Sequence, residues 1–437
     1  MNVEAKKTFQ GSRQNEIQTL KNLIHHQLMG RINLKVIEEL SEDEVRGQIT
    51  AVVRDLMEEQ TAILNESERK TLIDDILNEV LGLGPLESLL ADPSVSDILV
   101  NNAKNVYIER HGVLEKTHVH FEDDDHLLRI IEKIATGVGR RIDESVPMVD
   151  ARLPDGSRVN AVIPPLSLDG PSLSIRKFSI DPYTVKDLLN FKTMTKAMAK
   201  FLAAAVKSRV NILISGGTGS GKTTLLNVVS SSIPITERIV TIEDSAELQL
   251  QQPHVVRLET RPPNIEGTGA IKQRDLLRNC LRMRPDRIVI GEVRGGEAID
   301  MLQAMNTGHD GSLSTIHANS PRDALTRLEH MVGMGEAHIP PLVIRQQIAA
   351  AIDLVVHTER LADGHRVVTS IQEITGMEDS VVNMQEIFSY KRSSVDGAGR
   401  VVGKFQATGI RPTILNRIRE RGIELDERIF DENYLYE

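Results

Sequence analysis

Ile214-Ser215-Gly216-Gly217-Thr218-Gly219-Ser220-Gly221-Lys222-Thr223-Thr224 is the stretch that decides the fold of this chain. It matches G-x-x-x-x-G-K-[ST] at every position, with an apolar run at 210–214 before it and helix-forming residues at 225–229 after it. A phosphate-binding loop needs this strand–loop–helix setting. Its glycines let backbone N–H groups point at phosphate oxygens, and the helix N-terminus adds partial positive charge. The stretch predicts binding of a nucleoside triphosphate, against the alternative of a glycine-rich turn that matches by chance.

Within this loop the motif assigns two chemical roles. We expect Lys222 to reach the β- and γ-phosphates and the Thr223 hydroxyl to ligate Mg²⁺. ATP and Mg²⁺ are therefore the predicted ligands. The other predicted nucleotide-binding positions of the loop are Gly216, Gly217, Thr218, Gly219, Ser220, Gly221 and Thr224.

Composition limits the other classes of function. With 437 residues the chain is expected to form two or three domains. A net charge of −10 argues against a dedicated nucleic-acid binder, and an aromatic content of 3% with no Trp disfavours base-stacking platforms. A single cysteine, Cys280, excludes disulfides and cysteine zinc clusters within one chain and is expected to be a buried thiol.

No membrane-spanning segment is predicted. The N-terminus lacks the apolar core of a signal peptide, and no run of 18 uninterrupted apolar residues occurs. We therefore expect a cytoplasmic protein that contacts a membrane only through protein partners.

The chain before the loop divides by periodicity. Residues 1–15 are polar and are expected to be a flexible tail. Residues 16–88 carry three amphipathic helical patterns, which predict a small helical bundle, the second opened by a capping box of Ser41 and Glu44. The pair His25-His26 could ligate metal or lie on a solvated helix face.

Residues 89–180 are predicted to form an α+β domain. A strand is expected at 117–121, where His118 and His120 could be a metal pair or an exposed strand face. A helix begins near Asp123, and alternating strands at 148–153 and 158–163 flank the turn Pro154-Asp155-Gly156. The segment 181–194 is predicted to be a linker.

Residues 195–437 alternate helix and strand, which is typical of an α/β domain with a parallel sheet. Polar groups follow the apolar strands 210–214, 238–242, 287–290 and 312–316. In open α/β sheets the ligand lies beyond the carboxyl ends of the strands, so these groups are expected to converge on one crevice.

The predicted catalytic residues come from these strand ends. Glu292 is the candidate for polarising the attacking water, although Gly291 stands where a metal-holding aspartate often occurs. Mg²⁺ would then rest on Thr223, the phosphates and water, with Glu243 as a further candidate. Three alternatives stay open here: Glu243 could serve only a strand-end turn, His317 could sense the γ-phosphate or only pack, and His309 could bind nucleotide or only end a helix.

Arginines form two groups. Those at 274, 278, 282 and 284 are expected to form a charged helix face with ion pairs. Arg152, Arg158 and Arg176 lie outside the nucleotide domain, and an arginine delivered from another domain or subunit can raise the rate by about 10³–10⁵-fold. Spacing alone does not show that these three reach the phosphates.

Four boxes in order carry a resemblance: GGTGSGKTT, TIEDSAEL, LRMRPDRIVIGEVRGGEA and TGHDGSLSTIHANSP. Together they resemble the Walker A, aspartate, Walker B and histidine boxes of the type II/type IV secretion ATPase superfamily, most closely the CpaF-like motors of Tad (Flp) pili. The stretches ARLPDGSRVNAVIPP and LSIRKF resemble the family's N-terminal-domain arginine region. The resemblance spans roughly residues 70–437.

The resemblance implies a RecA-like ATPase domain after a PAS-like α+β domain, assembled as a homohexamer with the nucleotide held between the two domains. It implies Glu292 as the catalytic glutamate, Glu243 and His317 as members of their boxes, and Arg152, Arg158 and Arg176 as site-completing arginines. The expected function is an ATPase motor acting on inner-membrane platform proteins of a pilus or secretion system. A hexameric nucleic-acid translocase and a nucleotide-gated scaffold with little hydrolysis are the alternatives.

Overall fold

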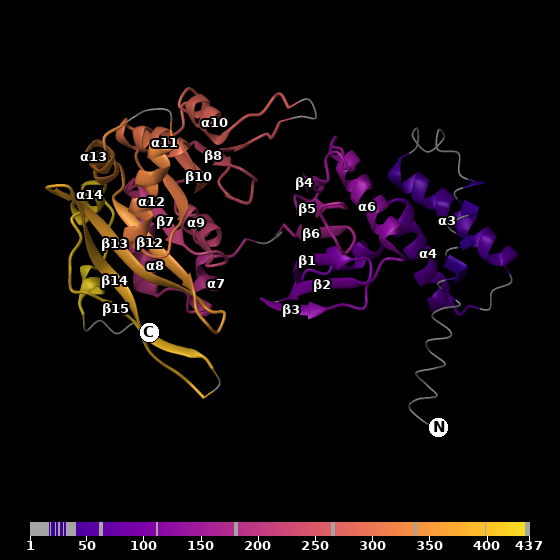
Figure 1. The fold of residues 1–437 in the computed structure, drawn as a ribbon. Helices are drawn as coiled ribbons and strands as arrows, with labels where there is room; N and C mark the ends of the chain where they lie inside the picture. The colour runs from indigo at the N-terminus through magenta and orange to yellow at the C-terminus, as the bar shows by residue number, and fades with distance from the viewer. Residues whose placement is uncertain are drawn as a thin grey trace. The chain divides into compact units, whose positions relative to one another are not determined.

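The computed structural model describes residues 17, 19–21, 23–24, 27–28, 30–31, 41–60, 64–110, 112–178, 182–263, 267–335, 339–397 and 399–432. The pair His25-His26 and the tail 1–15 lie outside these residues. The chain forms two compact units, Met1–Ser179 and Ile180–Glu437, and Figure 1 shows the elements of each.

The first unit begins with helices that share one apolar core. The described residues between 17 and 31 are helical, and they are followed by α3 (Glu42–Glu59) and α4 (Glu66–Val80). The predicted capping box of α3 is confirmed, because the Ser41 backbone N–H donates to Glu44 Oε2 at 2.9 Å. Buried side chains from all three segments pack together, among them Ile24, Leu28, Val53, Leu56, Leu72 and Ile76.

A six-stranded sheet follows in the order β3-β2-β1-β6-β5-β4, and all its strand pairs are antiparallel. The strands are β1 (Val95–Asn102), β2 (Asn105–Arg110), β3 (Val113–Lys116), β4 (Met148–Arg152), β5 (Arg158–Val162) and β6 (Ser172–Arg176). The apolar side chains of helix α6 (Asp124–Gly137) pack on one face of this sheet. The short helices η1 (Gly84–Leu86) and α5 (Glu87–Ala91) precede β1 in the chain.

One strand prediction is wrong. The strand lies at Val113–Lys116, and residues 117–121 form a loop that the buried side chain of Phe121 anchors, with its N–H donating to the Ala103 carbonyl at 2.8 Å. Every residue of β3 is exposed at the sheet edge, so no apolar alternation marks this strand in the sequence. His118 and His120 are exposed on that loop.

The second unit is built on a nine-stranded sheet in the order β15-β14-β13-β12-β7-β11-β10-β8-β9. Strands β12 to β9 of this order are parallel, and β13, β14 and β15 extend the sheet as antiparallel strands. The strands are β7 (Ile212–Gly216), β8 (Ile239–Glu243), β9 (Val255–Glu259), β10 (Arg287–Val293), β11 (Leu313–His317), β12 (Leu354–Arg360), β13 (Arg366–Glu378), β14 (Val381–Val395) and β15 (Val401–Ala407).

Helices cover both faces of this sheet. One face carries α7 (Val185–Asn190), α8 (Lys196–Lys207), α9 (Lys222–Ser230) and α14 (Leu415–Glu420), followed by η2 (Glu427–Phe430). The other carries α10 (Gln273–Cys280), α11 (Glu297–Asn306), α12 (Pro321–Gly333) and α13 (Pro341–Ala351). Helix α7 lies within the segment 181–194 predicted as a linker, and its Leu188 is buried in the first of these cores.

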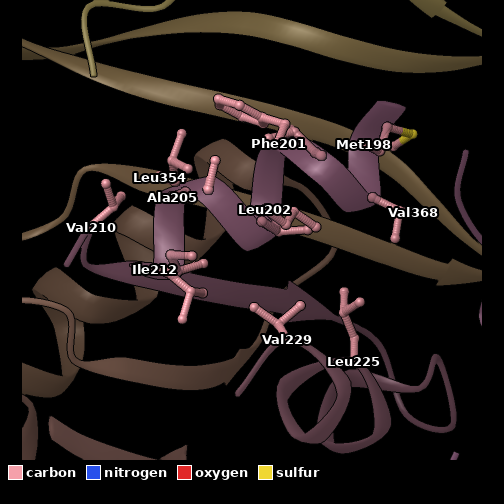
Figure 2. Close-up of a cluster of buried hydrophobic side chains, with 14 of the residues drawn as sticks. Met198, Phe201, Leu202, Ala205, Val210, Ile212, Leu225, Val229, Leu354 and Val368 are labelled. Atoms are coloured by element: carbon pink, nitrogen blue, oxygen red, sulfur yellow. The ribbon is translucent and has the colours of Figure 1, made fainter. Parts of the chain in front are cut away.

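The core behind the phosphate-binding loop fixes where that loop starts. Met198, Phe201, Leu202 and Ala205 of α8 meet Ile212 of β7, Leu354 of β12 and Val368 of β13, as Figure 2 shows. Leu225 and Val229 of α9 close the same cluster. On the opposite face Cys280 is fully buried, and burial raises the pKa of its thiol to about 12, so the prediction of a buried thiol is confirmed.

Candidate active site

The phosphate-binding loop runs from the end of β7 to the start of α9. Gly219 and Gly221 have φ angles of 68° and 91°, in the left-handed region that a side chain disfavours. A methyl group on Gly216 would clash with the Thr358 carbonyl oxygen and the Ser220 hydroxyl. The loop therefore needs glycine at these positions, for backbone conformation in two cases and for close packing in the third.

Strand β12 holds this loop from beneath. The Thr358 hydroxyl donates to the Ser220 carbonyl oxygen at 2.8 Å, and the buried Ser215 hydroxyl is hydrogen-bonded to His357 Nδ1 at 2.8 Å. These supports were not predicted, because the sequence does not show that β12 is the neighbour of β7. They keep the loop's curve fixed from the side opposite the solvent.

Lys222 lies almost completely buried at the start of α9. Its Nζ donates to the Gly217 carbonyl oxygen at 3.0 Å, within its own loop. Burial lowers the pKa of this lysine, and the neighbouring carboxylate of Glu292 acts in the opposite direction. A charged amine in such a place gains from an anion, so the lysine is poised to exchange the carbonyl for phosphate oxygens.

Glu292 is held by an arginine that the sequence reasoning passed over. Arg294 Nη2 and Nε lie 2.6 and 2.9 Å from Glu292 Oε2, and Arg294 Nη1 lies 3.4 Å from Asp244 Oδ2. Arg294 directly follows β10 and stands two positions after Glu292, and this i, i+2 spacing was a usable signal. The glutamate's side chain is 18% exposed, so solvent reaches it.

Glu243, at the end of β8, serves the following turn and also keeps one oxygen unused. Its Oε2 accepts from the backbone N–H groups of Glu247 and Leu248 at 2.7 and 2.9 Å. Its Oε1 is buried and has no hydrogen-bond partner within the described part of the chain. Burial raises the pKa of this carboxyl group. Gly291 makes room for it, since a Cβ there would lie 2.9 Å from Glu243 Cγ.

His317, at the end of β11, faces the loop. Its Nε2 lies 3.5 Å from the Thr218 hydroxyl. Burial and then the charge of Lys222 lower the pKa of the imidazole. The ring is therefore neutral near pH 7, with one nitrogen to donate and one to accept.

The structure does not bring His309 to this edge of the sheet. It follows the C-terminus of α11, with its N–H donating to the Ala304 carbonyl oxygen at 3.3 Å. Its own carbonyl accepts from the Ser312 hydroxyl just before β11 begins, while the nucleotide loop lies where β7 ends. The helix-end alternative describes this residue, and the nucleotide-binding prediction does not fit its place in this subunit.

Arg152, Arg158 and Arg176 form a row in the first unit. Arg152 pairs with Arg158 across β4 and β5, and Arg158 pairs with Arg176 across β5 and β6. Directly paired residues share a sheet face, and their neighbours Val159 and Ile175 point into the core on the other face. Three cations thus lie side by side on the face away from α6.

The charged face predicted on α10 is confirmed in part, since Arg274 and Arg278 both pair with Asp300 at 2.7 and 3.0 Å.

The residues present fit a magnesium ion that is shared with phosphates. Thr223 is the second residue of α9 and is partly exposed, and the unpaired oxygen of Glu243 is the kind of hard ligand that Mg²⁺ takes. Among the described residues no group of three or more His, Cys, Asp or Glu side chains could hold a metal alone. The chain therefore offers a site that a nucleotide would complete.

A parallel sheet with a phosphate-binding loop after β7, a histidine at the end of neighbouring β11, and carboxylates at the ends of β10 and β8 defines a P-loop nucleoside triphosphatase. Residues 79–401 match the family described as "Type II/IV secretion system protein". The chain belongs to this family, and it is an ATP hydrolase.

Curated relatives extend over most of the chain. A putative conjugal transfer protein of Mycobacterium tuberculosis is 35% identical over 325 residues, which cover 73% of this chain and 92% of that protein. The type IV secretion system protein VirB11 of Brucella suis is 33% identical over 302 residues, covering 63% of this chain and 84% of that protein.

Two solved structures are also similar. The crystal structure of the Brucella suis VirB11 ATPase in complex with sulphate has 32% identity and a TM-score of 0.37, covering 66% of this chain and 95% of that one. The pilus retraction motor PilT with bound ADP has 18% identity and a TM-score of 0.47, covering 77% and 85%. No helix in the described part of the chain is long and apolar enough to span a membrane.

Proposed function

We propose that this chain is the ATPase subunit of a hexameric cytoplasmic motor that powers assembly of a Tad-type (Flp) pilus or a related secretion apparatus. Membership of the type II/IV secretion family supports the motor class. The Tad assignment rests on the ordered motifs quoted above and on the single cysteine, which leaves no place for a four-cysteine zinc motif.

One observation carries the hydrolytic part of the proposal. Lys222, Glu292 and His317 come from three neighbouring strand ends, and the lysine's charge acts on both of the other side chains. Hydrolysis of the γ-phosphate needs neutralisation of negative charge, a polarised water and a hydrogen bond to the γ-phosphate. We assign the first to Lys222, the second to Glu292 and the third to His317.

The present contacts define what must change when ATP binds. Lys222 leaves the Gly217 carbonyl for phosphate oxygens, and His317 donates to the γ-phosphate. Glu292 then has to part from Arg294, because a carboxylate held by a guanidinium is a poor base. The freed carboxylate accepts a proton from the attacking water as the bond to the leaving ADP breaks. Mg²⁺, held by Thr223 with Glu243 as a candidate ligand, would neutralise charge on the phosphates.

We assign Arg152, Arg158 and Arg176, the arginine row of the first unit, to the state of the motor in which ATP is bound and hydrolysed. Three guanidinium groups on adjacent strands concentrate positive charge on one sheet face, and a triphosphate is an anion that this face could contact. We infer that Arg152, Arg158 and Arg176 supply the transition-state charge that Lys222 alone cannot supply. Release of ADP and phosphate then frees the row, and the resulting motion is what the platform proteins receive.

Thr223→Ala is expected to weaken binding of Mg²⁺-ATP much more than binding of ATP in EDTA. Because Gly291 brings no aspartate to the metal, Thr223 is the principal protein ligand, and its loss should lower Mg²⁺-ATP affinity by about 10-fold or more. Titration calorimetry with and without Mg²⁺ measures the difference. Thr326→Ala, at an exposed threonine of α12 outside the loop, is the matched control. An effect of Thr223→Ala as small as that of the control would show that the metal is held elsewhere.

The motor assignment is tested with the ATP-locked protein. Glu292→Gln with ATP should sediment at six times the 48.6 kDa of one chain and should retain a polytopic membrane protein from solubilised inner membranes. Lys222→Ala, which cannot hold phosphate, is the control and should retain less. Capture of single-stranded DNA together with strong stimulation of hydrolysis by it would favour a nucleic-acid translocase instead.

A further inference from the structure

The hairpin of β12 and β13 carries two arginines at the tip of the phosphate-binding loop. Arg360 ends β12 and Arg366 begins β13, and they face each other directly in the antiparallel register. Arg366 Nε donates to the Gly219 carbonyl oxygen at 2.9 Å. A methyl group on Gly219 would lie 3.7 Å from Arg360 Nη1. Both side chains therefore lie against the outer rim of the loop.

The charges at this place are unbalanced. Arg360 and Arg366 are both exposed, and like charges directly opposite each other destabilise an antiparallel pair. Nearby carboxylates are engaged elsewhere: Glu359 pairs with Arg392, and Asp363 accepts from the backbone N–H groups of His365 and Val401. Across the described residues the Arg360 guanidinium has no hydrogen-bond or ionic partner. An anion between the two arginines would remove the repulsion.

The orientation of ATP in the loop indicates which anion lies between Arg360 and Arg366. Strand β7 lies between β11 and β12 in the sheet. His317 and Glu292 lie on the β11 side, so the γ-phosphate points that way. The α-phosphate and the nucleoside must then leave the loop on the other side, where the β12–β13 hairpin stands.

A segment with exposed aromatic rings is fastened to the same hairpin. His365 Nε2 is hydrogen-bonded to the Phe191 carbonyl oxygen at 2.7 Å, and the Val368 N–H donates to the Thr193 carbonyl oxygen at 2.8 Å. The rings of Tyr183 and Phe191 meet edge to face at 5.5 Å and are 53% and 48% exposed. In a chain with 3% aromatic residues, this pair provides apolar ring surface beside the cationic hairpin.

We propose that Arg360 and Arg366 form a nucleoside-end subsite that binds the α-phosphate and ribose oxygens of ATP and ADP, with the base directed toward Tyr183 and Phe191. The subsite rests on the P-loop site described above and adds residues that set affinity without taking part in the chemistry. Arg366 also ties the hairpin to Gly219, so the loop and the subsite form together.

The test compares ligands with and without a nucleoside. Arg360→Ala and Arg366→Ala should each weaken ADP binding by about 10- to 100-fold, the range expected for one charge-assisted hydrogen bond. Binding of inorganic pyrophosphate, measured by the same titration calorimetry, should not change in Arg360→Ala, and in Arg366→Ala, which also loses the Gly219 contact, it should fall less than binding of ADP. KM for ATP should rise with kcat unchanged, and Arg→Lys at either position should recover part of the affinity. Arg411→Ala, at an exposed arginine that pairs with Asp431 at 3.0 Å outside the hairpin, is the matched control and should bind ADP as the wild type does.

Two outcomes overturn the subsite. Equal loss of ADP and pyrophosphate binding would show that the arginines only support the loop, and unchanged ADP binding in both variants would show that the nucleoside lies elsewhere. Arg360→Ala is the more decisive variant, because among the described residues Arg360 makes no hydrogen bond to the loop, and its loss leaves the contact of Arg366 with Gly219 intact. Neither outcome bears on Glu292, so the subsite and the hydrolytic motor fail separately.

Discussion

Glu292→Gln is expected to lower the rate of steady-state phosphate release by about 10²–10⁴-fold, the usual contribution of a general base. The amide keeps the shape of the side chain but cannot accept a proton from water. ATP affinity should be preserved, because Lys222 and the loop amides are untouched. Single-turnover phosphate release and fluorescent-nucleotide binding, measured on the same preparation, separate the two effects.

Glu259→Gln is the matched control for this variant. Glu259 ends β9 and stands opposite Glu243 in the parallel register, so it is another strand-end carboxylate on the same edge. Its replacement should leave turnover unchanged. Normal turnover in Glu292→Gln would remove the general-base assignment, whereas loss of ATP binding would show that the glutamate's pairing with Arg294 shapes the binding site itself.

Replacing Arg152, Arg158 and Arg176 together by glutamine is expected to have a comparable or larger effect, about 10³–10⁵-fold on kcat, if the row supplies transition-state charge. ATP binding to the loop should fall much less, because the neutralisation is needed most as charge spreads over the γ-phosphate. The three single variants then rank the arginines, which the sequence motif leaves unranked.

Arg110→Gln tests whether any arginine of this sheet would do. Arg110 lies on β2 of the same sheet and pairs with Asp92 at 2.8 Å and with Glu115. Its loss should affect the stability of the first unit without slowing hydrolysis. If the triple variant keeps wild-type kcat at saturating ATP, the row has another role, such as contact with a polar partner.

The sequence was informative wherever a local pattern and a fold rule acted together. The loop motif predicts β7 and α9, and the rule for strand ends in α/β sheets selects Glu243, Glu292 and His317 from the sequence alone. The hairpin around Asp155-Gly156 was equally local, and it appears as β4 and β5 with Arg152 and Arg158 directly paired.

What could not be read from the sequence depends on which strands are neighbours. Nothing local indicates that β12 lies beside β7, so the supports from His357 and Thr358 and the position of Arg360 were out of reach. The edge strand β3 has no buried face and hence no periodic signal. His309 was misplaced because Thr-Gly-His after a helix looks the same at either edge of a sheet.

The side chain of Glu243 fills the space that a side chain at position 291 would take. The glycine's missing side chain is filled by the glutamate's methylenes, so the two positions are a single unit of packing that spans two strands. An engineer who restores an aspartate at 291 would have to shorten residue 243 in the same step. In a set of related sequences these two columns should consequently vary as a pair, and a large residue at one should predict a small residue at the other.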